Sequence, residues 1–185
     1  MARYPFLSRR DIAQTAYNRP VILLKLGQGQ RSVFYNASHH ANEWITAPVL
    51  LKFLEQLAEA VRTGGTIFGV PAETLMKYTT IHAVPMVNPD GVDLVTGAIE
   101  PGSQSYEMAQ NLAEFYPGIP FPEGWKANLK GVDLNLQYPA GWLQAREIKF
   151  SQGYTRPGPR DYVGRAPLNQ RESLALARYT EEVDP

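Results

Sequence analysis

The chain contains 185 residues, with 18 basic and 18 acidic side chains that give a formal net charge of zero at pH 7. A balanced chain has no overall field to attract nucleic acid or an anionic membrane, and no apolar run approaches the roughly 18 residues of a membrane span. The sequence contains no cysteine, which excludes disulfides and thiolate metal ligands. At this length the chain is most simply one domain with a single core, and we expect neither nucleic acid nor membrane among its partners.

The first ten residues contain no apolar core of a signal peptide. The protein is therefore either cytoplasmic or made with a leader and earlier domains that this sequence does not include, and the localisation stays open.

Two apolar runs predict the first strands. They cover residues 21–26 and 32–37 and are separated by residues 27–30 (GQGQ). Short apolar runs joined by a glycine-containing turn are typical of a β-hairpin. We therefore predict a hairpin whose second strand carries residues 38–44 (SHHANEW) at its end.

Within that segment, His40 and Glu43 are three positions apart. Side chains at this spacing on a starting helical turn project from the same face, so an imidazole nitrogen and a carboxylate oxygen can converge on one cation. A carboxylate near a helix N-terminus is also favoured in its ionised form, which a metal ligand requires. The pattern alone is short and common, and a histidine and a glutamate that cap or solvate the helix end are the alternative.

Apolar side chains then recur at helical spacing between about residues 44 and 62, and Gly64 and Gly65 end the pattern. This helix should face the core. Because proline is tolerated best in a first turn, Pro48 predicts that regular helix begins nearer Ala47, with a separate turn holding Glu43.

A mostly apolar, β-branched run at residues 79–87 predicts a buried strand, and residues 88–91 (NPDG) predict a turn shaped by Asp90. His82 lies inside this strand and is the only histidine besides His39 and His40. We interpret His82 as a core histidine satisfied by hydrogen bonds. We expect the His39 side chain to point away from the metal ion that its neighbour His40 would bind.

The rest of the chain is rich in loops, which carry functional residues on α/β scaffolds. We expect a short helix at residues 105–114 and Pro- and Gly-rich loops at residues 117–124 and 151–167. A final helix should follow a capping box at residues 169–172 and end near Glu182.

Three stretches, in order, resemble the motifs of the zinc carboxypeptidase superfamily. Residues 38–46 (SHHANEWIT) are similar to its first metal-binding motif, and residues 87–91 (VNPDG) and 131–135 (GVDLN) follow. Residues 38–44 together with residues 124–128 (GWKAN) resemble most the bacterial branch that cleaves γ-D-glutamyl bonds to diamino acids in peptidoglycan peptides. The resemblance covers nearly the whole chain.

The resemblance implies an α/β fold, a three-layer α/β/α sandwich with a mixed central sheet, and Zn²⁺ bound by His40 and Glu43. In the family the basic residue that stabilises the oxyanion follows a tryptophan, so Lys126 after Trp125 is the candidate here. A solvated surface lysine is the alternative. The implied partner is a peptide substrate derived from peptidoglycan.

Asn135 is the candidate substrate contact, and an asparagine that shapes a turn is the alternative. Carboxypeptidases have an arginine directly after this asparagine to hold the terminal carboxylate of the substrate, whereas this chain has Leu136. A bidentate arginine contact of this kind is worth ~1.5–3 kcal/mol, and leucine supplies none of it. The departure argues against C-terminal exopeptidase specificity, which is the second alternative, and favours the γ-D-glutamyl branch.

In the family, a second histidine ligand lies on the strand after the last helix seen here, and the general-base glutamate lies much later. We therefore expect residues 1–185 to be the N-terminal part of one zinc carboxypeptidase-like catalytic domain, incomplete at its C-terminal side and inactive as a fragment. A non-catalytic peptide-binding module without a complete metal site is the alternative. A sheet without its later strands exposes an edge, so we also expect self-association through that edge.

Overall fold

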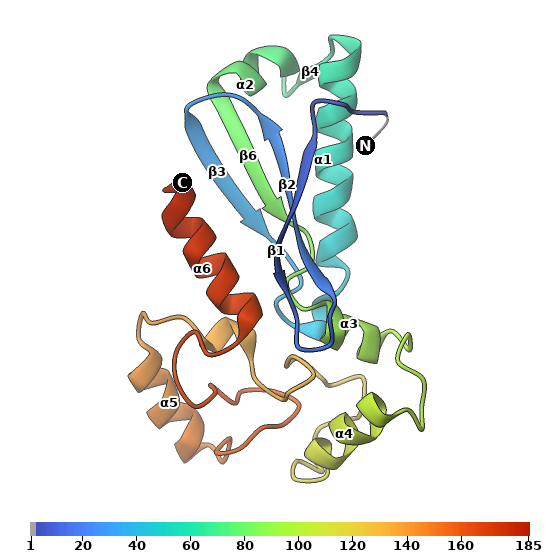
Figure 1. Cartoon of the computed structure of the whole chain (residues 1–185), viewed down its shortest axis with the longest axis vertical. Helices are drawn as coiled ribbons and strands as arrows, with labels where there is room; N and C mark the ends of the chain where they lie inside the picture. The colour runs from blue at the N-terminus through green and yellow to red at the C-terminus, as the bar shows by residue number, and fades with distance from the viewer. Residues whose placement is uncertain (1–2) are drawn as a thin grey trace.

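The structure is a computed structural model that describes residues 3–185, and its centre is a mixed four-stranded sheet (Figure 1). The strand order is β1-β2-β6-β3, in which β3 and β6 run parallel and the other neighbours run antiparallel. A separate two-stranded ribbon pairs β4 with β5. The strands are β1 (Ser8–Gln14), β2 (Pro20–Gly27), β3 (Arg31–Asn36), β4 (Thr66–Ile67), β5 (Val70–Pro71) and β6 (Thr79–Val84).

The hairpin predicted from residues 21–37 is wrong, although both of its strands exist as β2 and β3. Strand β6 lies between them and pairs with each. The β2–β3 connection crosses the start of β6, where the carbonyl of Gly29 accepts a hydrogen bond from Thr80 Oγ1. A Cβ at Gly29 would lie 1.8 Å from the carbonyl carbon of Tyr78, so only glycine permits so close a crossing.

Helices and short turns connect these strands. The predicted turn before the long helix is confirmed, because η1 holds Glu43, and Gly64 ends that helix in the left-handed conformation with φ of 69°. The predicted capping box is wrong, since Gln170 precedes the last helix without a side-chain capping bond among the described residues.

None of the helices within residues 3–185 combines the length and apolar character that spanning a bilayer requires. The elements are η1 (Ala41–Glu43), α1 (Thr46–Thr63), α2 (Ala72–Tyr78), α3 (Pro89–Val95), α4 (Gln104–Ala113), η2 (Leu134–Leu136), α5 (Trp142–Ser151) and α6 (Arg171–Val183).

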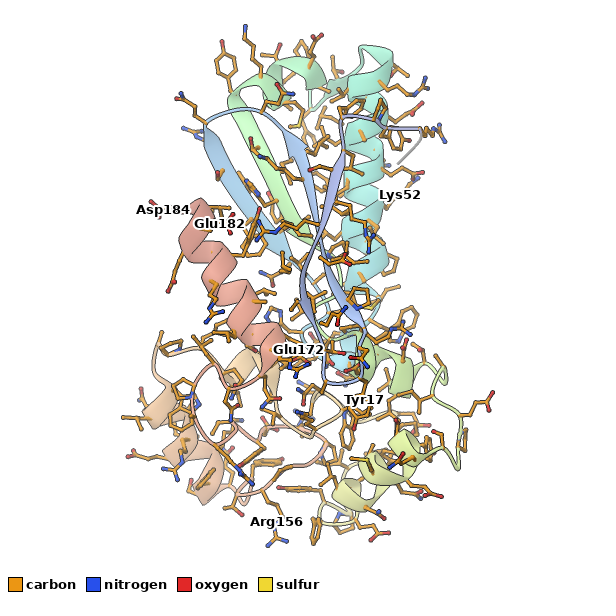
Figure 2. All side chains as sticks on the ribbon, viewed as in Figure 1. Tyr17, Lys52, Arg156, Glu172, Glu182 and Asp184 are labelled. Atoms are coloured by element: carbon orange, nitrogen blue, oxygen red, sulfur yellow. The ribbon has the colours of Figure 1, made fainter. Side chains whose placement is uncertain are left out.

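Separate hydrophobic cores lie on the two faces of the sheet. On one face, α1 and α2 pack against β2 and β6 around Leu26, Leu57 and Ile81. On the other face, Leu176 and Tyr179 of α6 pack against the same two strands. Figures 1 and 2 show α1 and α6 on either side of the sheet with side chains between them. The predicted α/β/α arrangement with a mixed central sheet is therefore confirmed.

A third core lies beyond the end of the sheet and supports the loops. It is built around Leu94 of α3 and Trp125, both of them fully buried, and it includes Ala109 of α4 and Ala41 of η1. The packing of Trp125 fixes the position of the next residue, Lys126.

The turn predicted at residues 88–91 is the beginning of a helix. Asn88 caps α3 by accepting a hydrogen bond from the N–H of Gly91, and Pro89 occupies the first helical position, where its missing N–H is tolerated. Asp90 is buried in the first turn of α3, and its Oδ1 has no hydrogen-bond partner among residues 3–185. Residue types that form turns also begin helices, so the pattern did not distinguish the two.

Candidate metal centre

His40 and Glu43 lie on the segment that connects β3 to α1. The hydroxyl of Thr46 ties the two ends of this segment together, because its Oγ1 accepts a hydrogen bond from the N–H of Ser38 at 2.9 Å and donates to the carbonyl of Glu43 at 2.7 Å. The candidate ligands are therefore carried by a turn whose backbone is held in place by the Thr46 hydroxyl.

The imidazole of His40 lies between two carboxylates. Its Nδ1 is 3.1 Å from Oε1 of Glu43, and its Nε2 is 3.1 Å from Oδ1 of Asp133. The hydrogen bond to Asp133 is the largest cause of a raised pKa of His40, and burial acts in the opposite direction. With Nε2–H donating to Asp133, Nδ1 is the nitrogen that faces Glu43, and it can bind a metal once its own proton is lost.

Asp133 is a candidate site residue that sequence reasoning did not single out. Its carboxylate is buried and accepts hydrogen bonds from the backbone N–H groups of Asn135 and Asp161, both at 3.2 Å. These bonds fix the carboxylate opposite His40. The only signal in the sequence was its place within residues 131–135, and a residue 93 positions from His40 carries no spacing information.

The structure brings Lys126 to the same site. Its Nζ is 3.9 Å from Oε1 of Glu43, and its side chain is 23% exposed. The N–H of Lys126 donates to the carbonyl of Pro159 at 2.7 Å, and its own carbonyl accepts from the N–H of Ala41 at 3.0 Å. Two backbone contacts therefore hold the main chain at Lys126 beside the candidate ligands, and the partly buried side chain brings its charge to Glu43, which supports a functional role over that of a freely solvated lysine.

Asn135 lies next to the centre, with an exposed side chain. Its backbone N–H donates to Asp133, so the residue is placed by η2 rather than by contacts of its own amide group. Leu136 follows on the same short turn. The role of Asn135 in binding substrate stays a prediction.

The geometry of His40 and Glu43 fits two of the coordination positions of one zinc ion. Zinc binds histidine nitrogen and carboxylate oxygen at about 2.0–2.2 Å, so two of its tetrahedral ligand atoms lie roughly 3.3 Å apart. Nδ1 of His40 and Oε1 of Glu43 are 3.1 Å apart, and the half-exposed Glu43 side chain can move outward to admit the ion. Within residues 3–185, no group of three or more His, Cys, Asp or Glu side chains is arranged to hold a metal. The described part of the chain therefore supplies two donors, whereas catalytic zinc sites ordinarily use three.

Each of the other two histidines is hydrogen-bonded to a tyrosine. Nε2 of His39 lies 2.9 Å from the hydroxyl of Tyr138, and burial, followed by the charge of His40, lowers the pKa of His39 to about 4. His82 is buried in β6, where its Nδ1 lies 2.6 Å from the hydroxyl of Tyr179. The structure thus agrees with the interpretation of His82 as a core histidine.

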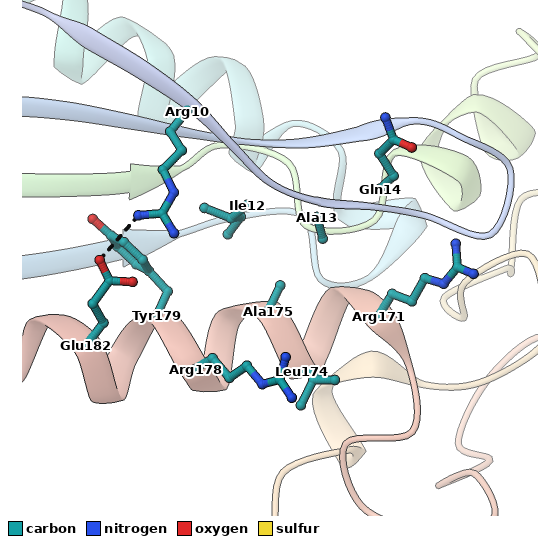
Figure 3. A pocket seen from close by; sticks show the side chains of 10 residues that line it. All are labelled: Arg10, Ile12, Ala13, Gln14, Arg171, Leu174, Ala175, Arg178, Tyr179 and Glu182. Carbon is teal, nitrogen blue, oxygen red and sulfur yellow. Dashed lines mark hydrogen bonds and ion pairs between the residues drawn. The ribbon is translucent and has the colours of Figure 1, made fainter.

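Among the grooves that lie outside the centre in the described part of the chain, two are of interest. One, of about 460 Å³, lies between β1 and α6 and is lined by Arg10, Arg171, Arg178 and Glu182, among others (Figure 3). Arg10 is paired with Glu182 at 3.2 Å, and the other two arginines are exposed, as arginines on a helix surface usually are. The second groove, of about 420 Å³, is lined mainly by apolar side chains of β3 and α1. Neither groove includes a candidate ligand.

Comparison with known proteins identifies the family. The sequence model of zinc carboxypeptidases matches residues 1–184. The chain is 41% identical over 178 residues to gamma-D-glutamyl-L-diamino acid endopeptidase 1 of Lysinibacillus sphaericus, and the matched region covers 96% of this chain and 43% of that protein. It is 27% identical over 176 residues to human carboxypeptidase B, and here the matched region covers 94% of this chain and 36% of that protein. The crystal structure of carboxypeptidase A from Helicoverpa armigera matches with a TM-score of 0.67 at 19% identity, over 98% of this chain and 39% of that chain.

The chain therefore belongs to the zinc carboxypeptidase family, as its three motifs predicted. The solved structure shares the fold of the described residues. The chain spans less than half the length of each of these three relatives.

Proposed function

We propose that the protein is a zinc-dependent peptidase that cleaves γ-D-glutamyl bonds to diamino acids in bacterial cell-wall peptides, and that this chain supplies one side of its active site. The pair of contacts made by His40 carries the proposal, since Nε2 contacts Asp133 while Nδ1 faces Glu43. Zinc-binding histidines are commonly oriented by a carboxylate in this way. Membership of the zinc carboxypeptidase family supports zinc as the metal.

Each residue has a separate task in this proposal. Zinc, when bound, supplies a Lewis acid that polarises the scissile carbonyl. His40 and Glu43 hold the ion, and Asp133 keeps a proton on Nε2 of His40, so that Nδ1 is the nitrogen that gives up its proton and binds the ion. Lys126 places a positive charge where negative charge develops on the substrate oxygen, and it acts as a point charge without the planar fork of arginine.

Two observations support the substrate class. The relative from Lysinibacillus sphaericus is named for γ-D-glutamyl-L-diamino acid bonds. In addition, Leu136 stands where carboxypeptidases have the arginine that holds a terminal carboxylate, and its side chain has no polar group to replace that contact. Asn135, exposed on η2, is the proposed polar contact to the substrate. Both observations favour cleavage of a γ-glutamyl bond over removal of a C-terminal residue.

A non-catalytic peptide-binding role is the second candidate, and the number of metal donors favours it. Residues 3–185 bring together two donors rather than three. Loss of an outer-shell partner alone lowers metal affinity about 10–100-fold. A missing direct ligand should lower the affinity more than a missing outer-shell partner. We therefore expect the 185-residue chain by itself to bind zinc weakly and to hydrolyse no peptide.

Zinc titration by calorimetry tests the metal centre. The unmodified chain should show weak binding that His40→Ala and Glu43→Ala each abolish. Glu73→Ala is the matched control, because Glu73 is also an exposed glutamate near the start of a helix. Binding that survives both ligand substitutions would refute the centre.

Peptide hydrolysis tests the activity. In a longer protein that contains this chain and cleaves a γ-D-glutamyl-diaminopimelate peptide, His40→Ala and Glu43→Ala should abolish turnover while the fold persists in circular dichroism. Retained turnover in either variant would exclude the proposed peptidase mechanism. Turnover by the unmodified 185-residue chain would show that two donors suffice.

A further inference from the structure

Asn88 lies between the two segments that carry the candidate residues. It is fully buried, follows β6 and caps α3. Its Nδ2 donates to the carbonyls of Ala127 at 2.9 Å and His39 at 3.2 Å, with the carbonyl of Lys126 at 3.4 Å. Three carbonyl oxygens around one nitrogen also fix the orientation of the amide, because an oxygen in that place would face only acceptors.

The remaining polar groups of Asn88 are used as well. Its Oδ1 accepts from the N–H of Gly91 at 3.1 Å, and its backbone N–H donates to the carbonyl of Ser38 at 3.0 Å. The surrounding space is closed, since a Cβ at Gly91 would lie 2.7 Å from the carbonyl oxygen of Ala127. One side chain therefore connects the segment of His40, the segment of Lys126 and the first turn of α3.

We propose that Asn88 is a positioning residue that sets the separation between His40 and Lys126. The roles of those two residues rest on the proposed function, whereas the contacts of Asn88 do not. The carbonyl of His39 belongs to the peptide unit that leads into His40, and the carbonyl of Lys126 also accepts from the N–H of Ala41 at 3.0 Å. Both main chains are thus held against one amide group.

This separation has a chemical consequence at the centre. Nζ of Lys126 lies 3.9 Å from Oε1 of Glu43, at the outer limit of an ion pair. If Lys126 moved closer, its ammonium would compete with a metal for Glu43. If Lys126 moved away, its charge would no longer support the substrate oxygen. By holding both segments, Asn88 keeps Lys126 between these two extremes.

The capping and positioning roles of Asn88 use different atoms, so substitutions can separate them. Asn88→Asp keeps the acceptor that caps α3 and replaces the Nδ2 donor with an oxygen that faces carbonyls. Asn88→Ser also keeps an acceptor for the cap, but its shorter side chain does not span the gap between the two segments. Ser103→Ala is the matched control, because Ser103 caps α4 by accepting from the N–H of Tyr106 and lies outside the centre.

Hydrogen exchange at the Ala41 amide tests the positioning role without any metal. Both Asn88 variants should speed this exchange about tenfold or more relative to buried α1 amides of the same molecule, because the link that holds the Ala41–Lys126 contact is lost. Ser103→Ala should leave the relative rate unchanged. Unchanged relative exchange in Asn88→Ser would overturn the inference, and this variant decides alone if Asn88→Asp does not fold.

Zinc titration separates this inference from the proposed function. The Asn88 variants should bind zinc about tenfold more weakly than the unmodified chain, as expected for a lost outer-shell contact. If the unmodified chain binds no zinc, the proposed function fails, and exchange at Ala41 still decides the positioning role. If the unmodified chain and Asn88→Ser bind zinc equally and exchange at the same relative rate, the inference fails and the proposed function stands.

Discussion

Nε2 of His40 lies 3.1 Å from Oδ1 of Asp133, and this contact joins two parts of the chain that are 93 residues apart. Asp133 is buried and held by the N–H groups of Asn135 and Asp161. Because the carboxylate is fixed by the backbone, it holds a proton on Nε2 of His40 and sets the orientation of the imidazole. The candidate metal centre therefore depends on a long-range contact as well as on the local spacing of His40 and Glu43.

Asp133→Asn should lower the pKa of His40 in the metal-free protein, because the hydrogen bond to Asp133 is the largest cause of its elevation. Zinc affinity should fall about 10–100-fold in the same variant. NMR titration of the His40 ring measures the first effect and calorimetry the second. Asp11→Asn, at an exposed position of β1, is the control. A His40 pKa that stays raised without the Asp133 carboxylate would contradict this prediction.

Two buried carboxyl groups should make the fold less stable as the pH rises. Burial raises the pKa of Asp90 and of Glu172. Below the ordinary carboxyl pKa, both the folded and the unfolded chain bind these protons, so there is no penalty. Above that value the unfolded chain ionises first and the folded chain binds more protons. The contribution of these two groups to the free energy of unfolding therefore falls with rising pH until their raised pKa values are passed.

Asp90→Asn should reduce this pH dependence and raise the free energy of unfolding at neutral pH by ~1 kcal/mol, since an uncharged amide costs less to bury than a carboxylate without a full set of partners. Urea unfolding at a series of pH values measures both effects. Asp11→Asn should leave the slope unchanged. Equal slopes in Asp90→Asn and the unmodified chain would rule out Asp90 as a source of the effect.

In a catalytically competent protein that contains this chain, Lys126→Ala should lower kcat more than it raises KM. An oxyanion contact forms mainly in the transition state, and its loss typically costs about 10²–10³-fold in kcat. Lys130→Ala is the control, because Lys130 is an exposed lysine on the same connection. A rise in KM with unchanged kcat would instead assign Lys126 to substrate binding.

The edge strand β3 should support self-association of the 185-residue chain. Within residues 3–185, β3 pairs on one side only, with β6. Tyr35, Ile45 and Val49 lie beside this edge and are 44%, 56% and 64% exposed. Unprotected edges pair readily with other chains, and exposed apolar patches favour association.

Val49→Lys should therefore shift the chain toward monomer in multi-angle light scattering. Leu143→Lys is the matched control, because Leu143 is a similarly exposed apolar residue on α5. A clean monomer of the unmodified chain at high micromolar concentration would contradict the prediction.

Local patterns in the sequence predicted local features of the fold. The spacing of His40 and Glu43, the helix that follows them and the buried strand β6 each depend on neighbouring residues, and each is present in the structure. Long-range features were missed. No pattern in residues 21–37 indicates that β6 lies between β2 and β3, because that strand begins only at residue 79.

Among the elements that were missed, two lack a one-sided apolar pattern. Strand β1 is exposed along most of its length, so its sequence shows no alternation. Helix α5 buries only Trp142, and its other side chains give no helical apolar stripe. Asp133 was missed for a different reason, since its contact with His40 joins residues that only the folded chain brings together.

The position of zinc in a crystal of this chain would test the metal centre most directly. Anomalous diffraction at the zinc absorption edge, from crystals of the chain soaked in zinc, locates the ion even when its affinity is low. We predict zinc bound by Nδ1 of His40 and the carboxylate of Glu43 at about 2.0–2.2 Å, with Nε2 still bonded to Asp133. Zinc bound through Nε2, or zinc found only elsewhere while the contact between His40 and Glu43 stays intact, would contradict the proposed centre.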